Sequence, residues 1–211
     1  MPRTPSGRRA RPILLCLATV LLLSVPCVAA QASTRPARHH ATCAAPATRL
    51  QRSLDSLHYP WQKLGYRDVA VAPRRNGLLA LTTTGTIRRT DVYVDTCARE
   101  NDTLLRHVIA HEVGHQIDAE LMTDALRARW MRARHLPAGT PWYACDRCPV
   151  WATGEGDFVE VFSFWQTSCY SGTAAPAPTR DELRSLIRLI PGQTTPFAGD
   201  RGHPSWADCN P

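Results

Sequence analysis

Apolar residues recur every three or four positions along several stretches of the chain, which is the spacing of an amphipathic helix. The longest stretch predicts a helix from about Asp102 to Leu121, and residues 101–103 supply the capping chemistry with which helices begin. Shorter stretches predict four further helices, over Pro46 to Leu57, Asp124 to His135, about Gly156 to Thr167, and Asp181 to Ile190.

Three strand-like segments lie between the first two of these helices: Asp68 to Ala72, Leu78 to Thr84, and Asp91 to Thr96. Turn-forming residues separate them, at 73–77 and at Thr84-Gly85. Because small strands are followed by helices, the sequence predicts an α+β fold. We expect a small antiparallel or mixed sheet packed on the long helix, with further helices C-terminal to it.

Residues 1–30 are typical of a secretory signal peptide. Arginines precede an apolar run, Ile13 to Val25, which is too short for a comfortable membrane span and is followed by the small residues Val28-Ala29-Ala30. Arg8-Arg9 leaves a twin-arginine signal open as an alternative, and Cys27 leaves a lipoprotein signal open. We therefore expect secretion and no membrane association after signal cleavage.

The remainder of the chain is predicted to be a flexible leader, residues 31–42, followed by one domain, residues 43–211. An irregular tail is expected from about residue 191. Removing the four arginines of the signal segment from the 25 basic residues leaves 21 against 18 acidic ones, a net charge of +3. So weak a charge does not favour nucleic acid as a partner, and we expect the processed chain to be a monomer.

Six cysteines remain after the signal segment, and an even number in a secreted chain is typical of disulfides. They are candidates for three disulfide bonds, of which one would tie the tail: Cys43, Cys97, Cys145, Cys148, Cys169 and Cys209. The spacing Cys145-x-x-Cys148 also fits half of a zinc knuckle, but no second pair completes one. The sequence does not select among the 15 possible connectivities.

Five residues of the predicted helix 102–121, His111-Glu112-Val113-Gly114-His115, form the H-E-x-x-H pattern of zinc hydrolases. His111 and His115 lie one turn apart on one face, so both imidazoles can bind one zinc ion. Glu112 follows the first ligand and can take a proton from the water that zinc activates. Gly114 destabilises a helix unless another segment approaches closely there. The motif predicts one zinc ion per chain and hydrolysis of a peptide bond.

A third zinc ligand has to come from elsewhere in the chain. Leu121 stands six residues after the motif, where the metzincin extension requires His or Asp, so that class is excluded. The predicted helix 156–167 carries Asp157 and Glu160 among apolar neighbours, where a carboxylate is costly to bury unless it is paired or metal-bound. Glu160 has the longer reach and is our first choice. Asp157 is the alternative, and Glu155 is a further candidate.

The segments HEVGHQID and GDFVEVFSFW resemble the gluzincin peptidases related to the catalytic domain of anthrax lethal factor. They are similar, more closely, to small secreted actinobacterial proteins with an HExGHxxD helix and a D-F-x-E-x-F helix. The resemblance covers roughly residues 60–170 and implies a zincin-like fold. It also implies that His111 and His115 bind zinc, that Glu112 is the general base, and that the helix around 157–160 supplies the third ligand.

Two positions depart from that pattern. The zinc-binding glutamate of the lethal-factor-like proteins aligns with Gly156, which shifts the ligand to Glu160 or to Asp157. The tyrosine expected to stabilise the transition state is missing from residues 149–155, and Tyr143 is the nearest candidate.

Three other segments bear on the predicted site. Asp118 lies on the same helical face as both motif histidines and can orient an imidazole, a role that is also open to Asp157. His107, four residues before His111, is interpreted as an exposed or core histidine because two histidines and a carboxylate complete the expected ligand set. The strand Asp91 to Thr96 is the nearest sheet edge on which a peptide substrate could add.

The sequence thus predicts a secreted zinc metallopeptidase whose partner is a peptide or protein substrate. Two alternatives remain open. One is an extracellular binding module that binds zinc without catalysis. The other is a disulfide-stapled domain without a metal.

Overall fold

The computed structural model describes residues 46–64, 68–73, 78–84, 88–94, 102–145 and 149–193. The predicted signal peptide and flexible leader lie outside these residues, as does the tail from residue 194 onward. All the described elements belong to one unit of the chain, residues 41–211. No helix among them is long and apolar enough to cross a membrane.

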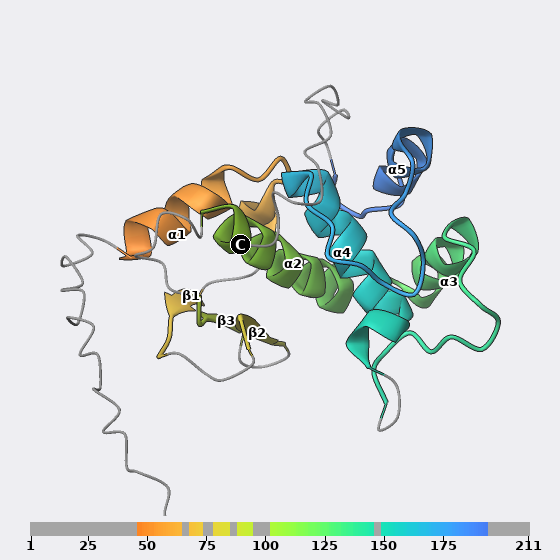
Figure 1. The fold of residues 1–211 in the computed structure, drawn as a ribbon, viewed down its shortest axis with the longest axis horizontal. Coiled ribbons are helices and arrows are strands. Elements are labelled where there is room, and N and C mark those ends of the chain that lie inside the picture. The colour runs from red at the N-terminus through yellow and green to blue at the C-terminus, as the bar shows by residue number, and fades with distance from the viewer. Residues whose placement is uncertain are drawn as a thin grey trace, which may run out of the picture. The chain divides into compact units, whose positions relative to one another are not determined.

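Within the described residues, five α-helices form most of the regular structure (Figure 1): α1 Pro46–Asp55, α2 Asp102–Leu121, α3 Asp124–Ala133, α4 Gly154–Thr167 and α5 Arg180–Ile187. Short 3-10 helices occur at Trp61–Lys63 and Val150–Ala152. The helix α2 carries the H-E-x-x-H motif, and α4 packs along it more extensively than any other element. The predicted helices are all present, with ends shifted by at most three residues.

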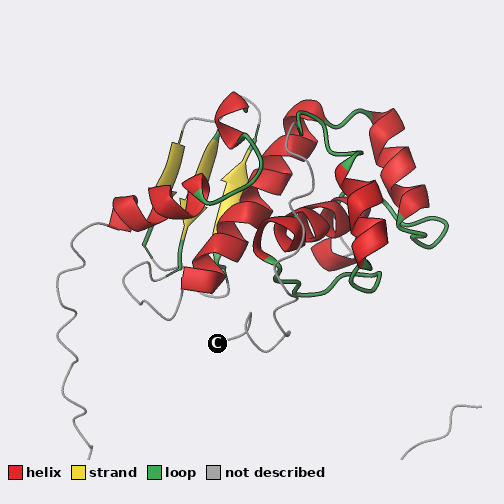
Figure 2. Cartoon of the chain, turned by 90° about the horizontal axis from the view of Figure 1, so that it is seen from above, coloured by secondary structure: helices red, strands yellow, loops and turns green. Residues whose placement is uncertain are grey.

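In the part of the chain that the structure describes, three short strands form a mixed sheet beside α2 (Figure 2): β1 Asp68–Val71, β2 Ala80–Thr83 and β3 Arg89–Val92. The strand order is β1-β3-β2, with β1 parallel and β2 antiparallel to β3. The predicted α+β class is therefore confirmed. The proposal that the segment beginning at Asp91 offers a free edge to substrate is wrong, because β3 is the central strand and pairs on both sides.

A glycine allows α2 and α4 to approach each other closely. A Cβ atom at Gly114 would lie 3.0 Å from Cβ and 3.1 Å from Cα of Val159 on α4, so even a methyl group would require Val159 to shift. The expectation that something approaches the motif helix at this position is confirmed. The contact matters for the site because it brings the acidic residues of α4 next to the histidines of α2.

Nearly the whole of α4 lies inside the hydrophobic core. Phe158 and Phe162 are fully buried, and Phe158 packs edge-on against the buried ring of Trp130 from α3. Thr153 caps the N-terminus of α4 by accepting a hydrogen bond from the backbone N–H of Gly156. Packing on both sides thus fixes the rotation of α4, and with it the direction of each carboxylate that it carries.

Candidate functional site

Three histidines follow one another at intervals of four residues along α2. His107, His111 and His115 therefore lie on one face of the helix, and the rings of His111 and His115 have centroids 5.1 Å apart. His107 is buried, whereas the side chain of His111 is 28% exposed. Sequence reasoning set His107 aside, yet its spacing from His111 is the same as that between the two motif histidines.

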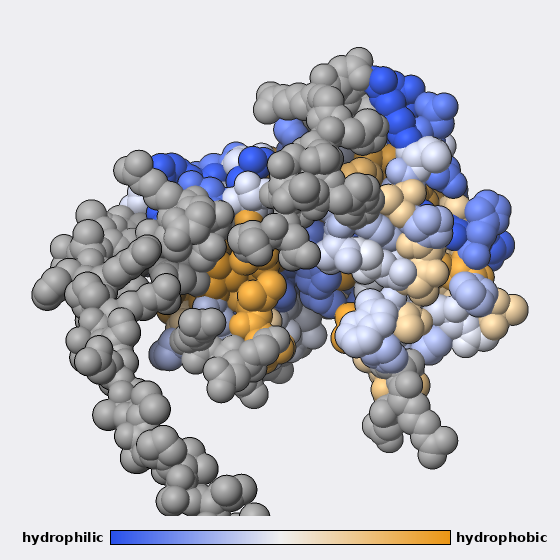
Figure 3. All heavy atoms as spheres, in the orientation of Figure 1, coloured by the Kyte–Doolittle hydropathy of each residue, from blue (hydrophilic) through white to orange (hydrophobic). Residues whose placement is uncertain are grey.

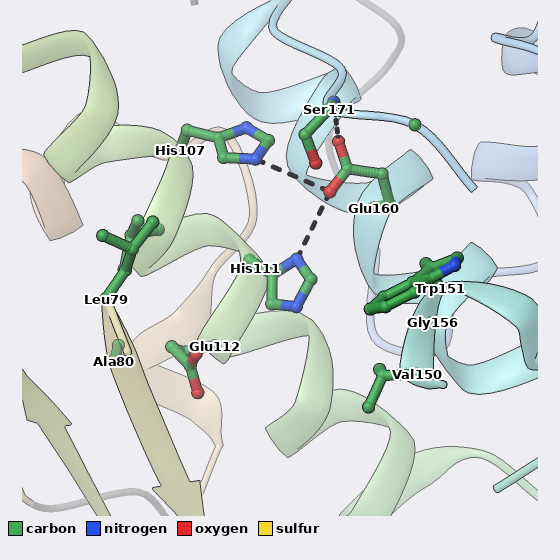
Figure 4. A pocket seen from close by; sticks show the side chains of 12 residues that line it. Leu79, Ala80, His107, His111, Glu112, Val150, Trp151, Gly156, Glu160 and Ser171 are labelled. Atoms are coloured by element: carbon green, nitrogen blue, oxygen red, sulfur yellow. Dashed lines mark hydrogen bonds and ion pairs between the residues drawn. The ribbon is translucent and has the colours of Figure 1, made fainter. Parts of the chain in front are cut away.

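Glu160 on α4 points at the first two of these histidines (Figure 4). Its Oε2 atom lies 3.5 Å from Nε2 of His107 and 3.4 Å from Nδ1 of His111. Its other oxygen accepts a short hydrogen bond from the backbone N–H of Ser171. Burial alone would raise the pKa of Glu160, but hydrogen bonds from His107 and His111 outweigh burial and lower the pKa to about 2. Glu160 is therefore a charged carboxylate at neutral pH.

His115 pairs with a different acid. Its Nδ1 atom lies 2.9 Å from Oε1 of Glu155 at the start of α4, within hydrogen-bonding distance. Burial lowers the pKa of His115, but the hydrogen bond to Glu155 and the charge of Glu112 outweigh burial and raise it. The structure thus brings together His111 and Glu160 of the predicted ligand set, while His115 contacts Glu155.

Asp157, the alternative third ligand, is engaged elsewhere. Its two carboxylate oxygens form hydrogen bonds with Arg134 at 2.9 and 3.0 Å, with Trp130 at 2.9 Å and with Thr173 at 2.8 Å. Four donors occupy the lone pairs of the carboxylate, which is fully buried. The structure therefore gives Asp157 a structural role: it ties α3 to α4 and is neither a ligand nor an orienting partner of a histidine.

Asp118 and Tyr143 contact Arg127 rather than a histidine. Oδ1 of Asp118 accepts hydrogen bonds from Arg127 at 3.0 Å and from Trp142 at 3.1 Å, rather than from a histidine. Burial raises the pKa of Asp118 more than these two donors lower it. The ring of Tyr143 is half exposed and lies 5.2 Å from the Arg127 guanidinium. Both predicted residues thus belong to a cluster around Arg127.

A cavity of about 420 Å³ opens between α2, α4 and the strand β2 (Figure 4). Its wall combines polar residues of the site with apolar ones: Leu79, Ala80, His107, Val108, His111, Glu112, Val150, Trp151, Gly156, Glu160, Ser171 and Gly172. Glu112 and His111 therefore face the same cavity as Glu160. Such a cavity, apolar with a few converging polar groups, is typical of a small-molecule or peptide-binding site.

Gly156 explains why the usual ligand position is unavailable here. A Cβ atom on Gly156 would lie 2.0 Å from the carbonyl oxygen of Val150, which is far inside van der Waals contact. No side chain fits at this position while the 3-10 helix Val150–Ala152 is in place. The departure from the lethal-factor-like pattern is thus matched by the packing around it, and among the acids of α4 it is Glu160 that lines the cavity.

Two of the candidate disulfide cysteines lie within the described residues. Cys145 and Cys169 each take part in a disulfide. The other four candidates, Cys43, Cys97, Cys148 and Cys209, lie outside them. The pairing of the six cysteines therefore stays a prediction.

Comparisons of the chain with family models, curated proteins and solved structures find no match. The resemblance to the gluzincin peptidases accordingly rests on the two helical motifs, and the chemistry of the site has to be argued from its own residues.

Proposed function

We propose that this chain is a secreted, zinc-dependent hydrolase that cleaves peptide bonds and has a zincin-like fold. The observation that carries the proposal is the convergence of His111, Glu112 and Glu160 on one cavity. Imidazole nitrogen and carboxylate oxygen are donors that zinc accepts at about 2.0–2.2 Å, usually in a tetrahedral set. His111 and Glu160 would supply two ligands, and a second imidazole of α2 would supply the third.

Glu112 is the residue that would move the proton. Zinc, when bound, polarises a carbonyl group and makes a water more acidic. Glu112 faces the cavity beside His111 and would accept a proton from the attacking water, then pass it to the leaving amine. Its position next to the ligand His111 in the chain keeps the base within reach of the reacting groups.

The strand β2 is suited to hold an extended peptide. Among the described strands it lies at an edge of the sheet, and Ala80 lines the cavity together with the adjacent Leu79. Leu79 and Leu81 are half-exposed, and hydrophobic atoms gather over this part of the surface (Figure 3). A peptide could therefore add to β2 through its backbone, with apolar side chains of the peptide against these leucines.

Replacing Glu112 by glutamine tests the mechanism. The amide cannot accept the proton, so we expect hydrolysis of a peptide library to fall at least 100-fold while zinc content stays at that of the wild type. Glu120→Gln, the same change two turns further along α2 where the carboxylate pairs with Arg88, should leave activity unchanged. Full activity of Glu112→Gln would exclude Glu112 as the general base.

A zinc-binding module without catalysis is the second candidate. Hydrolysis is expected to need a tyrosine that stabilises the transition state, but none of the described tyrosines lines the cavity. Tyr143, the predicted candidate, lies against Arg127 instead. This observation favours zinc binding without catalysis. Zinc binding by the wild type together with no cleavage of any peptide in the library, in the presence or absence of a chelator, would decide for this alternative.

A further inference from the structure

The distances around Glu160 have the dimensions of a metal site. Its Oε2 atom is 3.5 Å from His107 Nε2 and 3.4 Å from His111 Nδ1, which is long for a hydrogen bond between charged partners. Two ligands of a tetrahedral zinc ion, each at about 2.0–2.1 Å, lie about 3.4 Å apart. The three ligand atoms lie within 4.8 Å of one another.

The contacts of Ser163 prepare His107 for such a role. The Ser163 hydroxyl donates to the backbone carbonyl of His107 at 3.0 Å, and its oxygen lies 2.8 Å from Nδ1 of the same residue. Ser163 thus engages Nδ1 of His107, and Nε2 is the ring nitrogen directed at Glu160. A metal-binding histidine is commonly held by a partner on its other nitrogen in this way.

His107 and Glu160 are both buried, and in the metal-free chain Glu160 accepts hydrogen bonds from His107 and His111. A zinc ion would take the place of these protons, because a histidine binds a metal through a deprotonated nitrogen. His111 adds a second nitrogen toward the same oxygen from one turn along α2.

His115 pairs with a different acid, although its ring centroid lies 5.1 Å from that of His111. Its Nδ1 lies 2.9 Å from Glu155, the length of a direct hydrogen bond, and His115 is not among the residues that line the cavity. His107, His111, Glu160 and the base Glu112 all line it.

We propose that the metal ligands of this chain are His107, His111 and Glu160, with His107 taking the place of the second motif histidine. The inference rests on the proposed function for the use of the metal in catalysis. It keeps Glu112 at the same cavity as the ion, and it makes Ser163 a positioning residue for His107. His115 and Glu155 then form a separate hydrogen-bonded pair that connects α2 to the start of α4.

Zinc affinity of matched variants tests the ligand set without any need for activity. The full chain is stripped with a chelator and titrated with zinc against a chromophoric competitor. His107→Gln is expected to weaken zinc binding at least 100-fold, whereas His115→Gln, the same change two turns along α2, should change it less than threefold. Ser163→Ala should weaken it about tenfold by releasing the imidazole of His107. Ser185→Ala, on the exposed side of α5, is the control for the loss of a serine hydroxyl.

A larger loss of affinity in His115→Gln than in His107→Gln would overturn the inference, as would equal losses or no loss in both. If His107→Gln does not fold, the ¹⁵N chemical shifts of the histidine rings in the wild type decide. Zinc should shift His107 Nε2 and His111 Nδ1, and a shift at the ring nitrogens of His115 would contradict the proposed set.

The inference and the proposed function fail in different ways. Zinc held by His107 together with no peptide cleavage supports the ligand set and contradicts the hydrolase. Cleavage that depends on zinc held by His115 supports the hydrolase and overturns the ligand set. A wild-type chain that binds no zinc overturns both.

Discussion

The buried ion pair between Asp157 and Arg134 is expected to stabilise the fold around the site, so breaking it should unfold the protein more readily. Arg134 donates two hydrogen bonds to the carboxylate and a third, at 2.8 Å, to the carbonyl of Pro176. The pair therefore joins α3, α4 and the segment after α4, in which Pro176 contacts Arg134 and Ser171 contacts Glu160. Both side chains are at least 96% buried.

The magnitude follows from what remains after substitution. Asp157→Asn leaves the Arg134 guanidinium buried without a counter-charge, and removing one partner of a buried pair costs about 3–5 kcal/mol. A domain of this size has a free energy of unfolding of about 5–15 kcal/mol, so the loss is a large fraction of the total. At about 2–4 °C per kcal/mol, the unfolding temperature should fall by about 10 °C.

Urea unfolding of the metal-free chain, followed by tryptophan fluorescence, measures this loss. Arg134→Met should cost a similar amount, and the double variant Arg134→Met with Asp157→Leu should be more stable than the sum of the single losses predicts. The control is Asp181→Asn, which breaks an Asp–Arg pair on the surface of α5 and should cost at most about 0.5 kcal/mol. A loss below 1 kcal/mol for Asp157→Asn, or zinc affinity lost at unchanged stability, would refute the structural role of Asp157.

Two further predictions concern the contact between α2 and α4. Gly114→Ala should destabilise the protein by about 1 kcal/mol in urea unfolding. Overpacking against Val159 costs about 1–3 kcal/mol, and the better helix propensity of alanine offsets about 1 kcal/mol of that cost. A more stable variant would show that the two helices can move apart freely. Glu160 has a pKa lowered from 4.5 to about 2 in the folded state, so its contribution to stability is present above pH 4.5 and is lost as the pH falls toward 2. In the metal-free chain the stability gap between wild type and Glu160→Gln should therefore narrow by about 3 kcal/mol between pH 5 and pH 2, and a constant gap would contradict the lowered pKa.

The local elements of this fold could be predicted because each is specified by its own residues. The range predicted for α2 agrees with the observed Asp102–Leu121, since a long apolar period and a capping segment define it. The strands were located only approximately: β3 begins at Arg89, two residues before the predicted start at Asp91. A strand of four residues has little pattern of its own, and its pairing depends on partners that the local sequence does not name.

The acids of α4 show where sequence reasoning stops. Asp157 and Glu160 are three residues apart and lie on nearly the same face, so periodicity cannot assign one to structure and the other to the site. The choice depends on Arg134, a residue of the turn that ends α3, which pairs with Asp157 and leaves Glu160 to face α2. That partner is 23 positions away in the sequence, and nothing in the spacing of the acids predicts it.

The position of His107 could be predicted from the sequence, because it extends the helical face of the two motif histidines. The interval from His107 to His111 equals the interval from His111 to His115, so one helical face presents three imidazoles of which a zinc ion needs two. The motif favours His111 and His115 as the zinc ligands. The tertiary contacts favour His107 and His111, because Ser163 contacts His107 beside Glu160 while Glu155 pairs with His115. Glu155, Glu160 and Ser163 all come from α4. The rotation of this helix against α2 therefore determines which pair of histidines would share an ion.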